Sequence, residues 1–284
     1  MAASAPGETR WTLGAGAPRR WVVLTVVMAV ALAVEVIVVA VLIAEPGGWR
    51  FGMDFAYYRE LAERWLADGT FYLPRQLEGP YIEGLLDQAS VVDTLYPPLA
   101  LVLFVPFTFL PAPLWWAIPI GVCAVVIRSF APAAWAWPVM LACLFWPRSV
   151  GSLAFGNTDM WIAACVAAGL RWGWPALLVL VKPSLAPLAL IGARNRAWWI
   201  GLVALVAFVV LSWQLWADYL QAMVNAGIPL TYSLHSVPLV AVALVAWLAR
   251  RDRVGMRPPA RGQLETRSAE SDPMPARETS HESR

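Results

Sequence analysis

Charged residues are scarce in this sequence. Only 14% of its 284 residues are Asp, Glu, Lys or Arg, whereas a typical soluble domain is about 25% charged. Hydrophobic residues make up 60% of the chain, and the mean hydropathy is +0.60. These values exclude an ordinary soluble domain and predict an all-α polytopic membrane protein.

Cysteine is also rare, and the common cofactor signatures are missing. Cys123, Cys143 and Cys165 lie in apolar runs without the spacing of metal ligands or of a disulfide framework, so we expect them to be small buried apolar residues. The sequence contains no Walker loop, no dinucleotide fingerprint and no basic nucleic-acid motif. We therefore expect no metal, no cofactor and no nucleic-acid partner.

Long apolar runs are what the sequence does contain. The first contains a single charged residue, Glu35, and is longer than the ~20 residues that cross a bilayer. Shorter runs, interrupted by proline, follow it, and we predict about eight transmembrane helices. Their expected ranges are 21–44, 97–110, 114–127, 131–146, 158–170, 174–192, 198–217 and 237–249.

Arginine clusters predict the orientation of these helices. Arginines precede the first helix and recur at 194–196 and 250–253, and short loops rich in Lys and Arg are usually cytoplasmic. A basic segment at 1–20 is therefore expected inside. A tail at 250–284, rich in Pro, Ser, Arg and Glu, is expected to be disordered and also cytoplasmic.

The same assignment gives sides to three single arginines. It places Arg148 inside, in a Gly/Ser turn at 147–156, where retained basic charge explains it better than phosphate binding. It places Arg128 and Arg171 outside, although loops rich in arginine are usually inside. The second outer loop is expected at 218–236.

Residues 45–95 form the one large polar loop of the membrane domain, which spans 21–249. This loop carries nine acids and four arginines and is expected outside. Apolar residues at helical spacing before Gly69 predict a helix that lies in the membrane interface. Asp54 stands at its start, where a carboxylate could cap the helix or act as a base on a substrate that arrives from the lipid.

Five short motifs lie in the predicted outer loops and at helix ends. They are Asp54-Phe55-Ala56-Tyr57-Tyr58 with Ala67-Asp68-Gly69-Thr70-Phe71-Tyr72, Tyr96-Pro97-Pro98-Leu99-Ala100, Gly156-Asn157-Thr158-Asp159, Lys182-Pro183 with Arg194-Asn195-Arg196, and Tyr232-Ser233-Leu234-His235. In this order they resemble the polyprenol-phosphate-mannose-dependent mannosyltransferases of glycosyltransferase family 87, which have the GT-C membrane fold. That family has longer chains and tends to show Gly-Gln-x-Asn as the third motif, so this chain looks like a shortened, divergent relative.

The resemblance implies a hexosyltransferase at the extracytoplasmic face of the plasma membrane. It would move a sugar, expected to be mannose, from a polyprenyl-phosphate donor to a glycan or glycolipid acceptor of the cell envelope, with inversion. The family motif gives the role of general base to Asp54, and the leaving phosphate needs cationic or hydrogen-bonding groups. The expected substrate-binding residues are Lys182, His235, Tyr58, Tyr96 and Asp159.

Plainer interpretations of these residues stay open. A lysine at the centre of a membrane helix costs about 2.5–3.5 kcal/mol, which favours a function for Lys182, but the side chain could also snorkel to the surface or pair with Glu35. Asn157 or Thr158 could simply cap a helix that begins at Asp159.

Another class of function also fits the composition. The chain could be a non-catalytic lipid-binding or assembly partner, or a small transporter with Glu35 and Lys182 in its path. In that case His235 would be an ordinary loop histidine. Transport predicts that Glu35 and Lys182 matter most, whereas catalysis predicts that Asp54 does.

Overall fold

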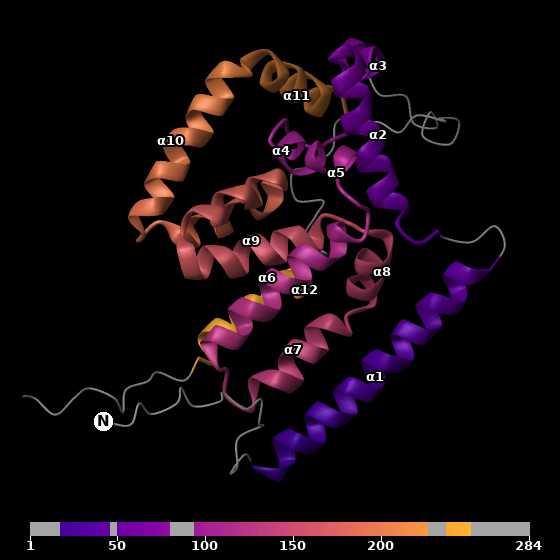
Figure 1. Ribbon diagram of the computed structural model, residues 1–284, viewed down its shortest axis with the longest axis vertical. Helices are drawn as coiled ribbons and strands as arrows, with labels where there is room; N and C mark the ends of the chain where they lie inside the picture. The colour runs from indigo at the N-terminus through magenta and orange to yellow at the C-terminus, as the bar shows by residue number, and fades with distance from the viewer. Residues whose placement is uncertain (1–17, 46–49, 80–93, 227–236, 251–284) are drawn as a thin grey trace, which may run out of the picture. The chain divides into compact units, whose positions relative to one another are not determined.

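The chain is helical throughout the part that can be described, and its helices are short. A computed structural model describes residues 18–45, 50–79, 94–226 and 237–250, and within these ranges there is no β-strand, which confirms the all-α class (Figure 1). The elements are α1 (Arg19–Ala44), α2 (Met53–Asp68), α3 (Pro74–Glu78), α4 (Ala100–Phe104), α5 (Pro106–Phe109), α6 (Leu114–Phe130), α7 (Ala136–Leu144), α8 (Pro147–Phe155), α9 (Asp159–Trp172), the 3₁₀ segments η2 (Trp174–Val181) and η3 (Pro183–Gly192), α10 (Arg196–Leu211), α11 (Trp213–Ala226) and α12 (Val237–Leu248).

Among the described helices, α1 alone is long and apolar enough by itself to cross a membrane. It has 26 residues. Two pairs would qualify if each counted as one span, but α7 and α8 are bent by 63° and α10 and α11 by 82°. By length and composition the described ranges therefore contain one candidate span, or up to three, where the sequence predicted eight.

The starts of α2, α6 and α9 lie close together, along with the end of α8. Gly52 N donates to Ala154 O at 2.9 Å, and the indole Nε1 of Trp115 donates to Gly156 O at 2.7 Å. We call this region, where the first turn of α2 meets these three helices, the Asp54 end.

The helix predicted at 97–110 is divided into two short pieces. The segment forms two short helices, α4 and α5, and Pro106 begins the second. Phe104 stacks on Tyr58 of α2, with ring centroids 4.6 Å apart. Because α6 then starts at the Asp54 end again, this segment leaves that end and returns to it.

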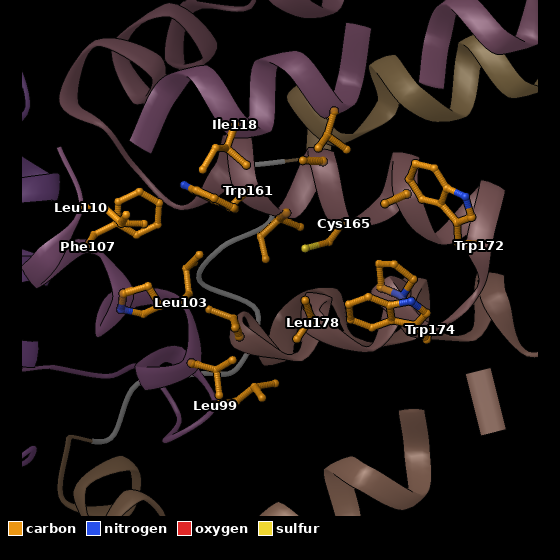
Figure 2. A pocket seen from close by; sticks show the side chains of 18 residues that line it. Leu99, Leu103, Phe107, Leu110, Ile118, Trp161, Cys165, Trp172, Trp174 and Leu178 are labelled. Carbon is orange, nitrogen blue, oxygen red and sulfur yellow. The ribbon is translucent and has the colours of Figure 1, made fainter. Parts of the chain in front are cut away.

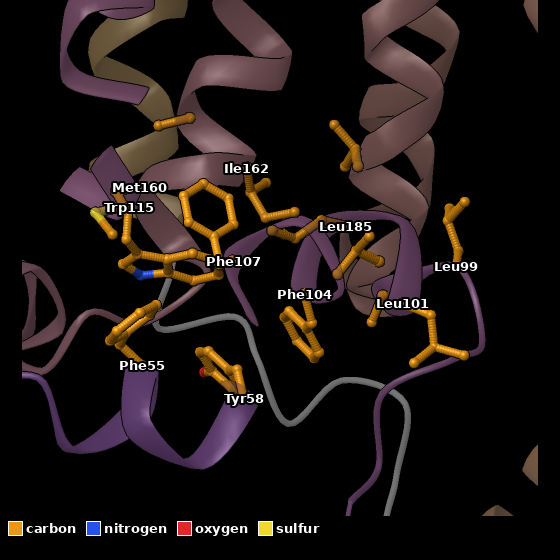
Figure 3. Close-up of a cluster of buried hydrophobic side chains, with 14 of the residues drawn as sticks. Phe55, Tyr58, Leu99, Leu101, Phe104, Phe107, Trp115, Met160, Ile162 and Leu185 are labelled. Atoms are coloured by element: carbon orange, nitrogen blue, oxygen red, sulfur yellow. The ribbon is translucent and has the colours of Figure 1, made fainter. Parts of the chain in front are cut away.

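The core beneath α2 is aromatic. Figure 3 shows Phe55 and Tyr58 of α2 facing Phe104, Phe107 and Trp115 from α4, α5 and α6. All five side chains are buried, as are Leu61 and Ala62 on the same side of α2. The apolar face predicted for this helix is therefore confirmed over its first three turns, while Leu66, which was also expected on it, is 46% exposed. The buried part of the face fixes the helix to the body of the chain.

Lys182 lies at the turn of a helical hairpin. η2 and η3 pack against each other, and at their other ends a Cβ added to Gly192 would stand only 2.2 Å from Gly173 O. Pro183 explains the turn, because a residue before proline is held extended and Lys182 has φ −118° and ψ 93°. The single span predicted at 174–192 is therefore wrong, since the segment enters and leaves at the same end.

The opposite end of the helices collects arginines. α6 and α9 both begin at the Asp54 end and pack along each other, so their last turns lie at the other end. There the connection after α6 meets the end of α12, with Ala133 N donating to Ala249 O at 2.8 Å. Figure 1 shows α1 running beside α7, and α1 also contacts α8. The arginines of this arginine end are Arg19, Arg20, Arg128, Arg171, Arg194, Arg196 and Arg250.

Two predicted arginine positions differ from this arrangement. Arg128 and Arg171 lie at the same end as the N-terminal arginines, whereas the sequence predicted opposite sides. The reason is parity. The segment at 97–110 does not run from one end of the body to the other, so each later segment runs opposite to the predicted direction until the hairpin turn at Lys182 adds a reversal. Arg148 lies at the start of the helix α8, which replaces the turn predicted at 147–156.

The second predicted outer loop begins as a helix. α11 occupies Trp213–Ala226 and packs on α3, where Asn225 Nδ2 donates to Gln76 O at 2.8 Å. The rest of that loop lies outside the described residues. So do the predicted tail beyond Arg250 and all but the last three residues of the predicted segment 1–20.

Candidate functional site

Asp54 is held by a residue from a distant part of the chain. The helix α2 begins after Gly52, and no side chain caps it. Oδ2 of Asp54 instead accepts a hydrogen bond from Nδ2 of Asn157 at 2.7 Å, across 103 residues of sequence. The capping interpretation of Asp54 is therefore wrong, whereas the predicted end of α2 at Gly69 is confirmed by its left-handed conformation.

Asn157 connects Asp54 with Lys182. Its Oδ1 accepts from Lys182 Nζ at 3.0 Å and from Asp159 N at 3.2 Å. Because this oxygen faces a cation, the amide nitrogen has to face Asp54. The bond to Asp159 N is the capping contact that the sequence suggested. The bridge to Asp54 was not predicted, and its one signal was the position of Asn157 in the third motif.

Lys182 and Asp159 form a buried ion pair. Their exposed fractions are 3% and 1%, and Nζ of Lys182 contacts Oδ1 of Asp159. Ser152 Oγ donates to the second carboxylate oxygen at 3.1 Å. The alternative pairing with Glu35 is wrong, because that side chain lies on α1, and its Oε2 is buried without a hydrogen-bond partner in the described ranges. The positive charge of Lys182 is thus already compensated.

Gly156 permits this close approach. It has φ +75°, and a Cβ there would lie 2.9 Å from the Trp116 ring and 3.0 Å from Cβ of Phe55. A side chain at this position would therefore push the turn between α8 and α9 away from α2. Glycine lets the turn place Asn157 against Asp54.

The charge environment makes Asp54 a stronger base than an exposed carboxylate. Burial is the largest effect and raises the pKa of Asp54 above its ordinary value. The hydrogen bond from Asn157 and the charge of Lys182 act in the opposite direction, and the charge of Asp159 adds to the increase. A half-buried carboxylate with a raised pKa is a stronger proton acceptor than an exposed one, which suits a general base.

Two predicted substrate residues, Tyr58 and Tyr96, belong to a chain of hydroxyl groups. Tyr58 and Tyr96 are joined through their hydroxyls at 2.9 Å, and Tyr96 reaches Thr158 Oγ1 at 2.9 Å. Burial raises the pKa of Tyr58 well above its ordinary value, so the phenol stays neutral. This chain ties α2 to the start of α9. Contact of either tyrosine with substrate stays a prediction, and His235 lies outside the described residues.

An apolar cavity of about 500 Å³ lies beside the ion pair, between α4, α5, α6, α9 and η2 (Figure 2). Val181 and Trp161 line it, one residue from Lys182 and two from Asp159. Trp172 and Trp174 line it toward the arginine end. Its walls are hydrocarbon and aromatic, so it suits an apolar chain.

No group of three or more His, Cys, Asp or Glu side chains that could hold a metal ion occurs in the described ranges. Comparison of the chain with known protein families, with curated proteins and with solved structures finds no match. The function has to be inferred from the residues themselves.

Breaking the ion pair from one side should destabilise the protein strongly. Lys182→Met leaves the Asp159 carboxylate buried without its cation, which we expect to cost about 3–5 kcal/mol of unfolding free energy. The double variant Lys182→Met/Asp159→Leu should recover most of this loss, because no buried charge is left unpaired. Thermal or denaturant unfolding in detergent measures both.

The matched control for this prediction is the exposed pair Arg59–Glu63 on α2. Arg59→Met should cost no more than about 0.3–0.5 kcal/mol, since exposed pairs at this spacing contribute little. Equal losses for Lys182→Met and Arg59→Met would contradict the buried pair, as would a double variant no more stable than Lys182→Met.

Proposed function

We propose that this chain is an integral membrane glycosyltransferase of the GT-C type that transfers a sugar from a polyprenyl phosphate to an acceptor hydroxyl. One observation carries the proposal. Asp54, Asn157, Asp159 and Lys182, from three separate motifs of the resemblance, are joined by hydrogen bonds and an ion pair at one place. In the sequence, Asn157 lies 103 residues from Asp54 and 25 residues from Lys182. The contact between these residues in the fold is support that the sequence alone does not give.

Asp54 is the general base of the proposed reaction. The acceptor oxygen forms a bond to the anomeric carbon, the bond from that carbon to the phosphate oxygen breaks, and the hydroxyl proton passes to Asp54. Asn157 occupies Oδ2, and in the described ranges no hydrogen bond reaches Oδ1, which leaves Oδ1 to take the proton. Direct displacement inverts the anomeric carbon and needs no second carboxylate.

The leaving phosphate needs positive charge, and Lys182 has a modified role in this proposal. Its ammonium group is paired with Asp159, so it acts through Asn157 by orienting the amide toward Asp54. The exposed arginine of the Asp54 end, Arg50, is the candidate to contact the phosphate. His235 keeps the role that the resemblance gives it.

The proposed membrane placement follows the arginines. The arginine end has seven arginines and, in the described ranges, no Asp or Glu, so we assign it to the cytoplasm. The Asp54 end is then extracytoplasmic, and both termini lie inside. Eight segments run between the two ends in this polytopic arrangement, namely α1, α6, α7 with α8, α9, η2, η3, α10 and α12.

The apolar cavity supports a lipid-linked donor. It begins within one residue of Lys182 and has an almost entirely apolar lining, so a prenyl chain could lie there while its phosphate stays at the Asp54 end. The same cavity also favours the second candidate function, a lipid-binding partner without catalysis. The transporter alternative loses its proposed Glu35–Lys182 pair, because Lys182 pairs with Asp159.

Asp54→Asn should reduce sugar transfer by roughly 10²–10⁴-fold, the usual contribution of a general base, while the unfolding temperature stays the same. The assay uses purified protein in lipid, radiolabelled polyprenyl-phosphate mannose and cell-envelope acceptors. Glu63→Gln on the exposed face of the same helix removes one charge as a control and should transfer normally. Normal turnover by Asp54→Asn would contradict the role of Asp54 as general base. Donor binding without transfer by the wild type would favour the lipid-binding partner.

The pH dependence of transfer should report the Asp54 carboxyl. Because the base has to be ionised, kcat/KM should fall as pH drops through the raised pKa of Asp54. Asn157→Leu removes the hydrogen bond that lowers this pKa, so the fall should begin at higher pH.

Ser152→Ala is the control for the pH profile, because Ser152 donates to Asp159 and not to Asp54. Its profile should keep the wild-type position. If Asn157→Leu lowered the rate equally at every pH, Asn157 would not act on the pKa of Asp54.

A further inference from the structure

A second cavity, far from Asp54, lies at the arginine end. It has a volume of about 490 Å³ and is formed where α9 ends, where the two ends of the η2–η3 hairpin meet, and where α10 begins. The polar and glycine residues that line it are Gly169, Gly173, Gly192, Arg194, Asn195 and Arg196.

The cavity is positively charged. Arg194 and Arg196 are exposed at its rim, and neither guanidinium pairs with a carboxylate within the described ranges. The sequence has no Asp or Glu between Asp159 and Asp218, and the one lysine in that stretch is buried at the other end of the hairpin. Among the residues that the structure describes, no carboxylate therefore neutralises the two arginines, and an anion would.

Exposed tryptophans near this cavity indicate its depth in the membrane. Trp172, Trp174 and Trp199 are 45%, 49% and 57% exposed, and Trp199 Nε1 donates to Ala193 O at 3.1 Å. Exposed tryptophans gather at the boundary between lipid and water. The cavity therefore lies where the headgroups of the membrane lipids are.

We propose that this cavity binds the phosphate headgroup of an anionic membrane phospholipid in the leaflet on the arginine side. The planar guanidinium groups of Arg194 and Arg196 match the geometry of phosphate oxygens, and basic pockets between membrane helices on this side suit such headgroups. Bound lipid would hold the base of the hairpin, whose tip carries Lys182. The inference rests on the proposed membrane placement and is independent of sugar transfer.

The test measures phospholipid binding to the full-length protein. Protein in phosphatidylcholine nanodiscs is titrated with phosphatidylglycerol, and the rise in unfolding temperature gives the half-saturating lipid fraction. Arg194→Gln/Arg196→Gln should weaken binding roughly 30-fold, at about a tenfold change per 1.4 kcal/mol and ~1 kcal/mol for each arginine near the surface. Both side chains are exposed, so this variant should fold as the wild type does in phosphatidylcholine alone.

The control removes the same charge at the same end but outside the cavity. Arg19→Gln/Arg20→Gln at the start of α1 should bind phosphatidylglycerol within a few-fold of the wild type. Equal weakening in both double variants would overturn the proposal, because only general surface charge would then attract the lipid. If the wild-type protein bound phosphatidylglycerol but transferred no sugar, the result would count against the proposed function and leave the assignment of this cavity standing.

Inorganic phosphate separates a lipid site from a site for a free anion. Millimolar phosphate in phosphatidylcholine nanodiscs should raise the unfolding temperature much less than phosphatidylglycerol does. Equal stabilisation by phosphate alone would overturn the assignment to a lipid.

Discussion

The arrangement of the Asp54 end depends on the buried ion pair between Lys182 and Asp159. Removing two charges from water costs roughly several kcal/mol for each ion. The attraction between the ions offsets this cost only when they are well aligned and their remaining polar atoms form hydrogen bonds. Here the lysine also donates to Asn157, and Ser152 donates to the aspartate. The pair therefore holds two chain segments together and, through Asn157, fixes the carboxylate of Asp54.

This dependence explains why the hairpin is built as it is. Pro183 forces an extended residue before it, so the chain turns at Lys182 and brings the ammonium group to the start of α9. Gly156 allows the turn before α9 to approach α2 closely. A proposed catalytic base is thus oriented before substrate arrives, which is how preorganised sites avoid rearrangement during the reaction.

Sequence patterns predicted the local features and missed the pairings. The face of α2 and its end at Gly69 follow from spacing and glycine chemistry, and they are confirmed. The turn at Lys182 was missed, because an apolar run looks the same whether it crosses once or folds back. The sequence also did not predict that Arg128 and Arg171 lie at the same end as the N-terminal arginines, for the same reason. The choice of Asp159 over Glu35 as partner of Lys182 depends on tertiary packing, which spacing along the chain does not contain.

Accessibility of position 171 relative to the exposed face of α2 tests the central claim most directly, because the two topologies place position 171 on opposite sides of the membrane. The protein would carry Cys at 63, on the exposed face of α2, or at 171 in a background with Cys123, Cys143 and Cys165 replaced by alanine. Intact cells would then be treated with a membrane-impermeant maleimide. The account predicts labelling at 63 in intact cells and at 171 only after permeabilisation. Labelling at both positions in intact cells would contradict it, because Asp54 and the start of α9 would then lie on different sides of the membrane.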